Sequence, residues 1–151
     1  EKEVIRKTNV MIEEKQAEIK FDENEDIRVF ADDFYIEQVL TNYLTNAIKN
    51  VKEMYGEKYI KISNEINKEE QKVCIKVFNT GEQISEENLN RIWNRFYKAD
   101  ESRHREDGGT GIGLAFVKAI MSNYDNKYGV KNLENGVEFY FELDMRQKGQ
   151  S

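Results

Sequence analysis

Polar side chains recur along one side of a predicted helix in the first third of the chain, at Asn42, Asn46, Lys49 and Asn50. Their spacing of i, i+4, i+7 and i+8 places three amides and one ammonium on the same flank of the helix. An amide oxygen is a suitable ligand for Mg²⁺, which keeps several waters and also binds substrate phosphates. Lys49 could then meet one of those phosphates. The spacing fits a solvated helix flank equally well, so both interpretations stay open.

A run of glycines, GGTGIG from Gly108 to Gly113, leads directly into another predicted helix. Glycines let backbone N–H groups converge on an anion, and the helix N-terminus adds partial positive charge. The run therefore favours a phosphate cradle, although a tight turn or a plain helix start gives the same pattern. A dinucleotide-binding turn needs an apolar strand before the glycines, where this chain has SRHRED. A P-loop needs Lys and then Ser or Thr after the last glycine, where Leu114 and Ala115 stand.

Composition excludes several other classes of protein. The 151 residues hold 23 Lys and Arg against 29 Asp and Glu, a net charge of −6, which argues against a binder of duplex nucleic acid. The single cysteine, Cys74, can form neither an internal disulfide nor a thiolate metal site alone, and we expect it to be a small strand residue. No apolar run approaches the roughly 20 residues of a membrane span. The chain opens on Glu1 rather than Met, as expected of a piece of a longer protein.

The hydrophobic pattern predicts the elements that must position these residues. Helices are predicted over residues 3 to about 17, from Asp32 or Asp33 to about 54, over about 86–93, and over 111–123. Strands are predicted over residues 18–21, 28–31, 59–66, 72–79, 127–133 and 137–145. Gly56 is expected to end the long helix, and the charged segment 97–109 to form a loop. This order favours a mixed sheet with helices on one face.

Four segments, in the order that a known family has them, resemble the ATP-binding catalytic domain of sensor histidine kinases, within the gyrase/Hsp90/histidine-kinase/MutL ATPase superfamily. QVLTNYLTNAIKN (38–50) is similar to the family's N box, and FNTGEQI (78–84) to its first glycine box. RIWNRFYKAD (91–100) is similar to the F box, and GGTGIGLAFVKAIM (108–121) to the second glycine box. Together these segments span residues 38–121, in the family's order and with its intervening lengths.

The resemblance implies one domain over residues 1–151 with a Bergerat-type ATP-binding fold. That fold is an α/β (α+β) two-layer sandwich, a mixed, mostly antiparallel sheet of about five strands with three helices on one face. ATP would lie between the N-box helix, the first glycine box and a flexible lid, and Mg²⁺ would accompany it.

The resemblance also implies a role for individual residues. Asn46 would bind Mg²⁺, Asn42 would support the polyphosphate, and Lys49 would contact phosphate, which makes these three the expected catalytic residues. Trp93 and Phe96 would anchor the base of the lid, while Lys98 and Arg103 would be lid cations that reach the phosphates. The remaining positions expected around the nucleotide are Asn50, Asn79, Gly81, Ile84, Tyr97, Gly109, Thr110, Gly111, Ile112, Gly113 and Leu114.

The base end of the expected site departs from the family pattern. The usual DxGxG of the first glycine box begins here with Asn79 in place of Asp, and Gln83 stands in place of the second glycine. Val137 stands where Thr is usual, and Asn50 occupies a position that is often aromatic. Because an amide oxygen can still accept a hydrogen bond from an amino group, we expect adenine recognition to be retained but retuned.

Two residues bear on the reaction. ATP-hydrolysing relatives place a Glu at the position of Asn42 to activate water, so the resemblance favours a kinase over a hydrolase. His104 lies in the expected lid, between two arginines and without the following acidic residue of an acceptor box, so we do not expect it to be the phosphoacceptor. The acceptor histidine is instead expected on a separate dimerisation domain, acting in cis or in trans, with relay to a response-regulator receiver domain.

The resemblance thus predicts a cytoplasmic domain of a protein anchored in the cell membrane, with no membrane or nucleic-acid contact of its own. One alternative is an anti-sigma-factor-type serine kinase of the same superfamily, against which the F-box-like segment 91–100 argues. Another is an interaction module that kept the fold but lost nucleotide binding, which Asn79 and Gln83 favour and Asn46 and Lys49 oppose.

Overall fold

The computed structural model describes residues 17–21, 34–94, 113–124 and 126–144. In these ranges a sheet of five strands forms, in the order β1-β2-β3-β5-β4. The strands are β1 (Glu18–Phe21), β2 (Tyr59–Asn67), β3 (Lys72–Thr80), β4 (Tyr128–Leu133) and β5 (Gly136–Asp144). β1 runs parallel to β2, and the other three pairings are antiparallel. The expected mixed, mostly antiparallel sheet is confirmed.

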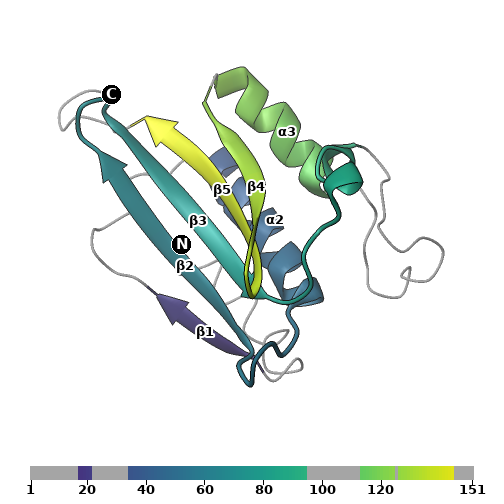
Figure 1. The fold of residues 1–151 in the computed structure, drawn as a ribbon. Helices are drawn as coiled ribbons and strands as arrows, with labels where there is room; N and C mark the ends of the chain where they lie inside the picture. Colours follow the sequence, from purple (N-terminus) through teal and green to yellow (C-terminus); the bar gives the residue numbers. More distant parts are fainter. Residues whose placement is uncertain (1–16, 22–33, 95–112, 125, 145–151) are drawn as a thin grey trace.

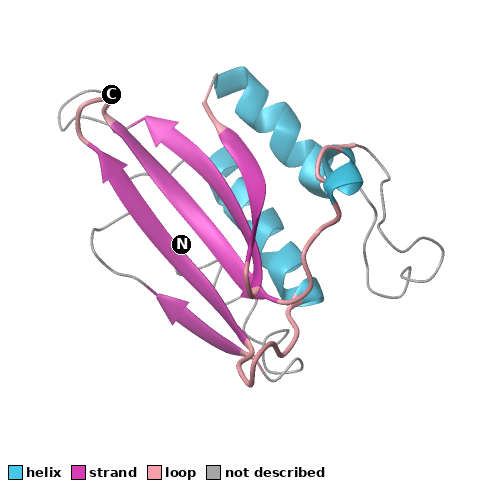
Figure 2. Cartoon of the chain, in the orientation of Figure 1, coloured by secondary structure: helices cyan, strands magenta, loops and turns pink. Residues whose placement is uncertain are grey.

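Two α-helices lie side by side on one face of this sheet, α2 (Phe34–Asn50) and α3 (Gly113–Tyr124) (Figures 1 and 2). The predicted two-layer sandwich is therefore confirmed. Neither of these helices is long and apolar enough to cross a membrane.

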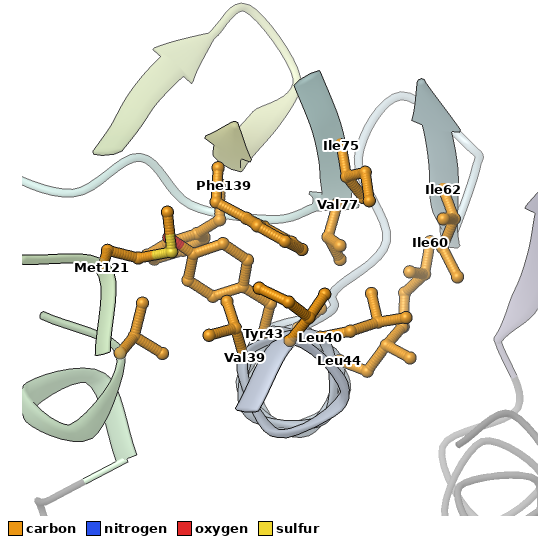
Figure 3. Packing of buried hydrophobic residues seen from close by; sticks show 14 of the residues in the cluster. Val39, Leu40, Tyr43, Leu44, Ile60, Ile62, Ile75, Val77, Met121 and Phe139 are labelled. Carbon is orange, nitrogen blue, oxygen red and sulfur yellow. The ribbon is translucent and has the colours of Figure 1, made fainter. Parts of the chain in front are cut away.

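An apolar stripe along α2, continued by Val51 just after it, forms the centre of the core. All of its members are buried, namely Ile36, Leu40, Tyr43, Leu44, Ala47 and Val51. Tyr43 is fully buried, and its ring lies 5.2 Å from that of Phe139 on β5, centroid to centroid (Figure 3). Its hydroxyl donates a hydrogen bond to the Tyr140 carbonyl at 3.0 Å, so the helix is fastened to the sheet by a polar contact within the apolar layer.

The long helix ends earlier than predicted, at Asn50 instead of about residue 54. The chain leaves the helix because the Lys52 N–H donates to the Thr80 carbonyl at the end of β3, at 2.9 Å. Gly56 does not cap the helix, which corrects the prediction. It has φ +83° and, with Tyr55 at φ +53°, forms a tight turn closed by hydrogen bonds between Met54 and Glu57.

The short helix predicted over 86–93 is replaced by two single 3₁₀ turns, η2 (Glu86–Asn88) and η3 (Arg91–Trp93). Ser85 precedes η2 but makes no side-chain capping hydrogen bond. A segment this short gains little from helical hydrogen bonds alone, so burial decides its path. Trp93 packs edge-on to Tyr43 and Tyr128, with ring centroids 6.4 and 5.1 Å apart.

The strands at 18–21, 59–66, 72–79, 127–133 and 137–145 all form, with bounds that differ from the prediction by one residue at most. The helix predicted at 3–17, apart from its last residue, lies outside the described residues. So do the caps Asp32 and Asp33, the strand predicted at 28–31 and the loop predicted at 97–109.

Cys74 is the small strand residue that the alternating pattern predicts. It lies in β3, paired with Glu65 of β2 and Glu142 of β5, on the face of the sheet away from the helices. Burial, together with these carboxylates, raises the pKa of its thiol to about 11, against an opposing effect of Lys76.

We therefore expect Cys74 to react slowly with iodoacetamide in the folded protein. At pH 8 a thiol with a pKa of about 11 is ~0.1% thiolate, against about a quarter for an ordinary cysteine, so alkylation should be about 200-fold slower. The rate should rise nearly tenfold per pH unit between pH 8 and 10. The same chain in urea is the control, and equal rates in the two states would contradict the expectation.

Candidate functional site

The polar residues Asn42, Asn46, Lys49 and Asn50 of α2, here called the amide stripe, lie beside the buried face of the helix. Each of them is partly or fully exposed to solvent. The side-chain amide of Asn50 donates to the Asn46 backbone carbonyl at 2.8 Å and to the Asn46 side-chain oxygen at 3.2 Å. Asn46 Oδ1 is thus oriented by its neighbour and keeps a second lone pair for a ligand. Lys49 lies on the same helix and is partly exposed.

The first residue of α3 comes close to the same stripe. A methyl group added at Gly113 would lie 3.2 Å from Oδ1 of Asn42, so the start of α3 approaches α2 at the level of this amide. Asn42 Nδ2 donates to the Gln38 carbonyl at 3.0 Å, which leaves its Oδ1 facing the beginning of α3. Leu114, the next residue, is partly buried against the core. The helix of the N-box segment and the helix that follows the glycine run therefore meet at Asn42.

A buried amide lies at the end of β3. Asn79 is 1% exposed, and its Nδ2 donates to the Thr80 carbonyl at 3.0 Å. Its Oδ1 accepts no hydrogen bond from the described residues. Among the described residues, one other buried side-chain atom has no hydrogen-bond partner, Glu138 Oε1 on the opposite face of the sheet. The Lys131 ammonium lies 3.9 Å from it. Because an unpaired buried acceptor costs about 1–3 kcal/mol, Asn79 Oδ1 is suited to a donor that arrives with a ligand.

Gly81 brings the end of β3 against the end of α2. A Cβ at this position would lie 2.8 Å from the Asn50 carbonyl oxygen and 3.2 Å from Asn79 Nδ2, and its φ of +153° also disfavours a side chain. The Gly81 N–H donates to the Asn135 carbonyl at 3.1 Å. The glycine of the first glycine box is thus required by the close approach of two backbones beside Asn79.

The loop after Gly81 is held from both sides by residues that the sequence did not single out as partners. Asn132 of β4 accepts from the Ile84 N–H at 2.9 Å and donates to the Ile84 carbonyl at 2.8 Å. On the other side Lys52 and Glu82 form an exposed ion pair, and the hydrogen bond from Lys52 lowers the pKa of Glu82. The sequence offered one indication of this role, because Asn132 is a polar residue on the side of a predicted strand that faces inward.

The structure brings six of the predicted site residues into two groups, Gly113 beside Asn42, and Gly81 beside Asn79 and Asn50, the last of which bonds to Asn46. Ile84 lies in the loop after Gly81, where Asn132 holds it. The predicted residues Phe96, Tyr97, Lys98, Arg103, Gly109, Thr110, Gly111 and Ile112 lie outside the described residues. Trp93 belongs to the aromatic core, and its role as an anchor of the lid stays a prediction.

Acidic and sulfur ligands do not make a metal site in the described part of the chain. No group of three or more His, Cys, Asp or Glu side chains there could hold an ion. The oxygens of Asn46 and its neighbours are neutral, so any Mg²⁺ bound here would need phosphate oxygens and water for most of its coordination.

A profile of the family described as "Histidine kinase-, DNA gyrase B-, and HSP90-like ATPase" matches residues 31–147. The chain therefore belongs to this family of ATPases, and the resemblance stated from its motifs is confirmed.

Sensor histidine kinases are among the curated relatives. YkoH of Bacillus subtilis is 37% identical over 110 residues, which are 73% of this chain and 23% of that protein. WalK of the same organism is 30% identical over 138 residues, 89% of this chain and 22% of that protein. The chain thus spans less than a quarter of the length of these relatives.

Solved structures of histidine kinases have the same fold as this chain. The catalytic domain of histidine kinase ThkA superposes with a TM-score of 0.72 at 28% identity, covering 95% of this chain and 88% of that one. ThkA in complex with the response regulator protein TrrA gives 0.68 at 28% identity, covering 99% of this chain and 40% of that one. The chain is therefore similar to the catalytic domain of a histidine kinase over nearly its whole length.

Proposed function

We propose that this domain binds Mg·ATP and supplies the γ-phosphoryl group that a longer sensor histidine kinase transfers to a histidine of its dimerisation domain. The observation that carries the proposal is the buried, unpaired Oδ1 of Asn79 at the end of β3. It lies beside Gly81, which contacts the end of the helix that bears the amide stripe. The family and the similarity to kinase catalytic domains support the same function.

The residues at the end of β3 fit adenine. The carbonyl of Thr80 can only accept, so its hydrogen bond from Nδ2 fixes which way the Asn79 amide points. Oδ1 is then the atom offered to a ligand, and the exocyclic amino group of adenine is a donor that would satisfy it. Guanine presents an oxygen at that position, which would meet Oδ1 as a second acceptor.

The residues of α2 fit the phosphate end. Asn46 would hold Mg²⁺ through Oδ1, which Asn50 already orients, and Lys49 would meet a phosphate. Mg²⁺ bound there would neutralise charge on the phosphate oxygens during transfer. Asn42 is an amide whose Nδ2 is engaged with Gln38, and an amide cannot deprotonate water. The absence of a base at this position favours transfer to a histidine over hydrolysis.

The acceptor and the final recipient lie on other domains. The structure of ThkA with TrrA motivates the proposal that a response regulator receives the phosphoryl group from the dimerisation domain of the longer protein. That protein would be anchored in the cell membrane, with this domain in the cytoplasm.

The proposed function is tested by titrating the domain with ATP in the presence and absence of Mg²⁺. The wild type should bind saturably, and Asn46→Ala should weaken binding in Mg²⁺ about tenfold while leaving metal-free binding unchanged. Thr41→Ala is the matched control, since Thr41 lies on α2 and its hydroxyl donates to the Glu37 carbonyl at 2.8 Å.

The wild type should also phosphorylate the histidine-bearing dimerisation domain of the longer protein when the two are mixed. A folded domain without saturable binding at millimolar ATP would contradict the proposal and favour an interaction module. Transfer to a serine protein and not to the histidine would favour the serine-kinase alternative.

A further inference from the structure

Side-chain hydrogen bonds attach the segment that follows β3 to β4, the strand on the far side of β5. The last backbone pair between β3 and β5 joins Thr80 to Gly136. Beyond it, the amide of Asn132 makes two hydrogen bonds with Ile84, one to the N–H at 2.9 Å and one to the carbonyl at 2.8 Å. One side chain thereby satisfies both backbone groups of Ile84, as a neighbouring strand residue would.

Gln83 makes a second contact of the same kind. Its Nε2 donates to the Leu133 carbonyl, the next residue along β4, at 2.8 Å. The family pattern has a glycine at this position, which could make no such hydrogen bond. The departure from the family pattern therefore coincides with an added attachment between the loop and the β4–β5 hairpin.

These attachments bear on Asn79 through the peptide that joins Thr80 to Gly81. The Thr80 carbonyl accepts from Asn79 Nδ2 at 3.0 Å and from the Lys52 N–H at 2.9 Å, so its direction sets the direction of the Asn79 amide. The N–H of the same peptide, that of Gly81, donates to the Asn135 carbonyl in the turn between β4 and β5, at 3.1 Å. Gly81, at φ +153°, lets the chain turn into the loop that follows. The hydrogen bonds of Gln83 and Asn132 attach that loop to β4, so they add to the contacts that already hold the peptide.

We propose that Asn132 and Gln83 are positioning residues for the base end of the nucleotide site. They fix the loop 81–84 against β4, and through it they keep Asn79 Oδ1 aimed at the 6-amino group of adenine. The proposal rests on the proposed function, since it assumes that adenine binds at Asn79. Neither residue needs to touch the nucleotide.

The test compares ATP with purine riboside triphosphate, which lacks only the 6-amino group. The wild type should bind ATP about tenfold more tightly, because one hydrogen bond to a buried acceptor separates the two ligands. Asn132→Ala should weaken ATP binding about tenfold and leave purine riboside triphosphate nearly unchanged, so that the preference disappears. Asn132→Asp, which keeps the acceptor for the Ile84 N–H, should restore part of it, and Gln83→Gly should lower it less than Asn132→Ala.

Two matched controls lie at the opposite end of the sheet, one at the end of β2 and one in the turn that joins β2 to β3. Asn67 accepts from the Glu70 N–H at 3.1 Å, and Gln71 donates to the Lys68 carbonyl at 2.8 Å. Asn67→Ala and Gln71→Ala remove the same types of hydrogen bond and should leave the preference for ATP intact.

The outcomes separate this inference from the function on which it rests. If the wild type prefers ATP and Asn132→Ala keeps that preference, or loses affinity for both ligands equally, the positioning role is wrong. If the wild type binds ATP and purine riboside triphosphate equally, Asn79 does not read the amino group and the inference also fails. A wild type that binds neither ligand overturns the proposed function itself.

Discussion

Gly136→Ala is expected to remove much of the stability of the domain. A Cβ at this position would lie 2.0 Å from the Asn79 carbonyl oxygen and 2.8 Å from Cζ of Phe78. The obstacle is the backbone of β3, which cannot rotate away as a side chain can, so the ladder between β3 and β5 has to open. We expect a loss of about 3 kcal/mol or more, which is a large part of the 5–15 kcal/mol typical of a domain.

Urea unfolding measures this effect, and another glycine of the same hairpin is the control. With a typical urea dependence, about 3 kcal/mol corresponds to a midpoint lowered by roughly 1–3 M. Gly129→Ala also places its Cβ against a neighbour, 2.5 Å from the hydroxyl of Tyr140, but that ring can move. It should shift the midpoint by less than half as much. Equal shifts for the two variants would show that the backbone of β3 yields more easily than the geometry implies.

Much of this fold could be predicted because periodic patterns report burial directly. The stripe on α2 alternates with polar residues at helical spacing, and β3 alternates Val73, Ile75 and Val77 with lysines and Cys74. Both patterns fix which face meets the core, so the layers follow from them. The motifs placed Asn46 on the long helix and Asn79 at the end of a strand, and the structure brings the end of α2 and the end of β3 together.

The remainder depends on contacts between distant segments that no local pattern encodes. α2 ends at Asn50 because the backbone of Lys52 bonds to Thr80, and the segment at 86–93 forms 3₁₀ turns where burial of Trp93 decides its path. The amide of Asn132 meets Ile84, 48 residues earlier in the chain. Such pairings follow from the register of β4 on β5, which turn geometry and packing set together.

Asn79→Ala is expected to weaken ATP binding about 10- to 100-fold, which is the largest change in nucleotide affinity that we predict. The substitution removes the acceptor for the 6-amino group and leaves that donor buried without a partner, at a cost of about 1–3 kcal/mol. Purine riboside triphosphate has no such donor, so its affinity should fall much less. The two ligands should then bind the variant about equally in a fluorescence or calorimetric titration.

Asn79→Asp separates the role of the acceptor from that of the amide as a whole. It keeps an oxygen for adenine but loses the donor to the Thr80 carbonyl, so we expect reduced stability together with a retained preference for ATP. Asn64→Ala, at another buried asparagine four pairs away along the β2–β3 ladder, controls for the loss of a buried amide. That variant should keep the preference whatever its stability. If Asn79→Asp loses the preference as fully as Asn79→Ala does, the orientation of the side chain matters more than its oxygen, because only the wild-type amide can donate to Thr80 and accept from adenine at once.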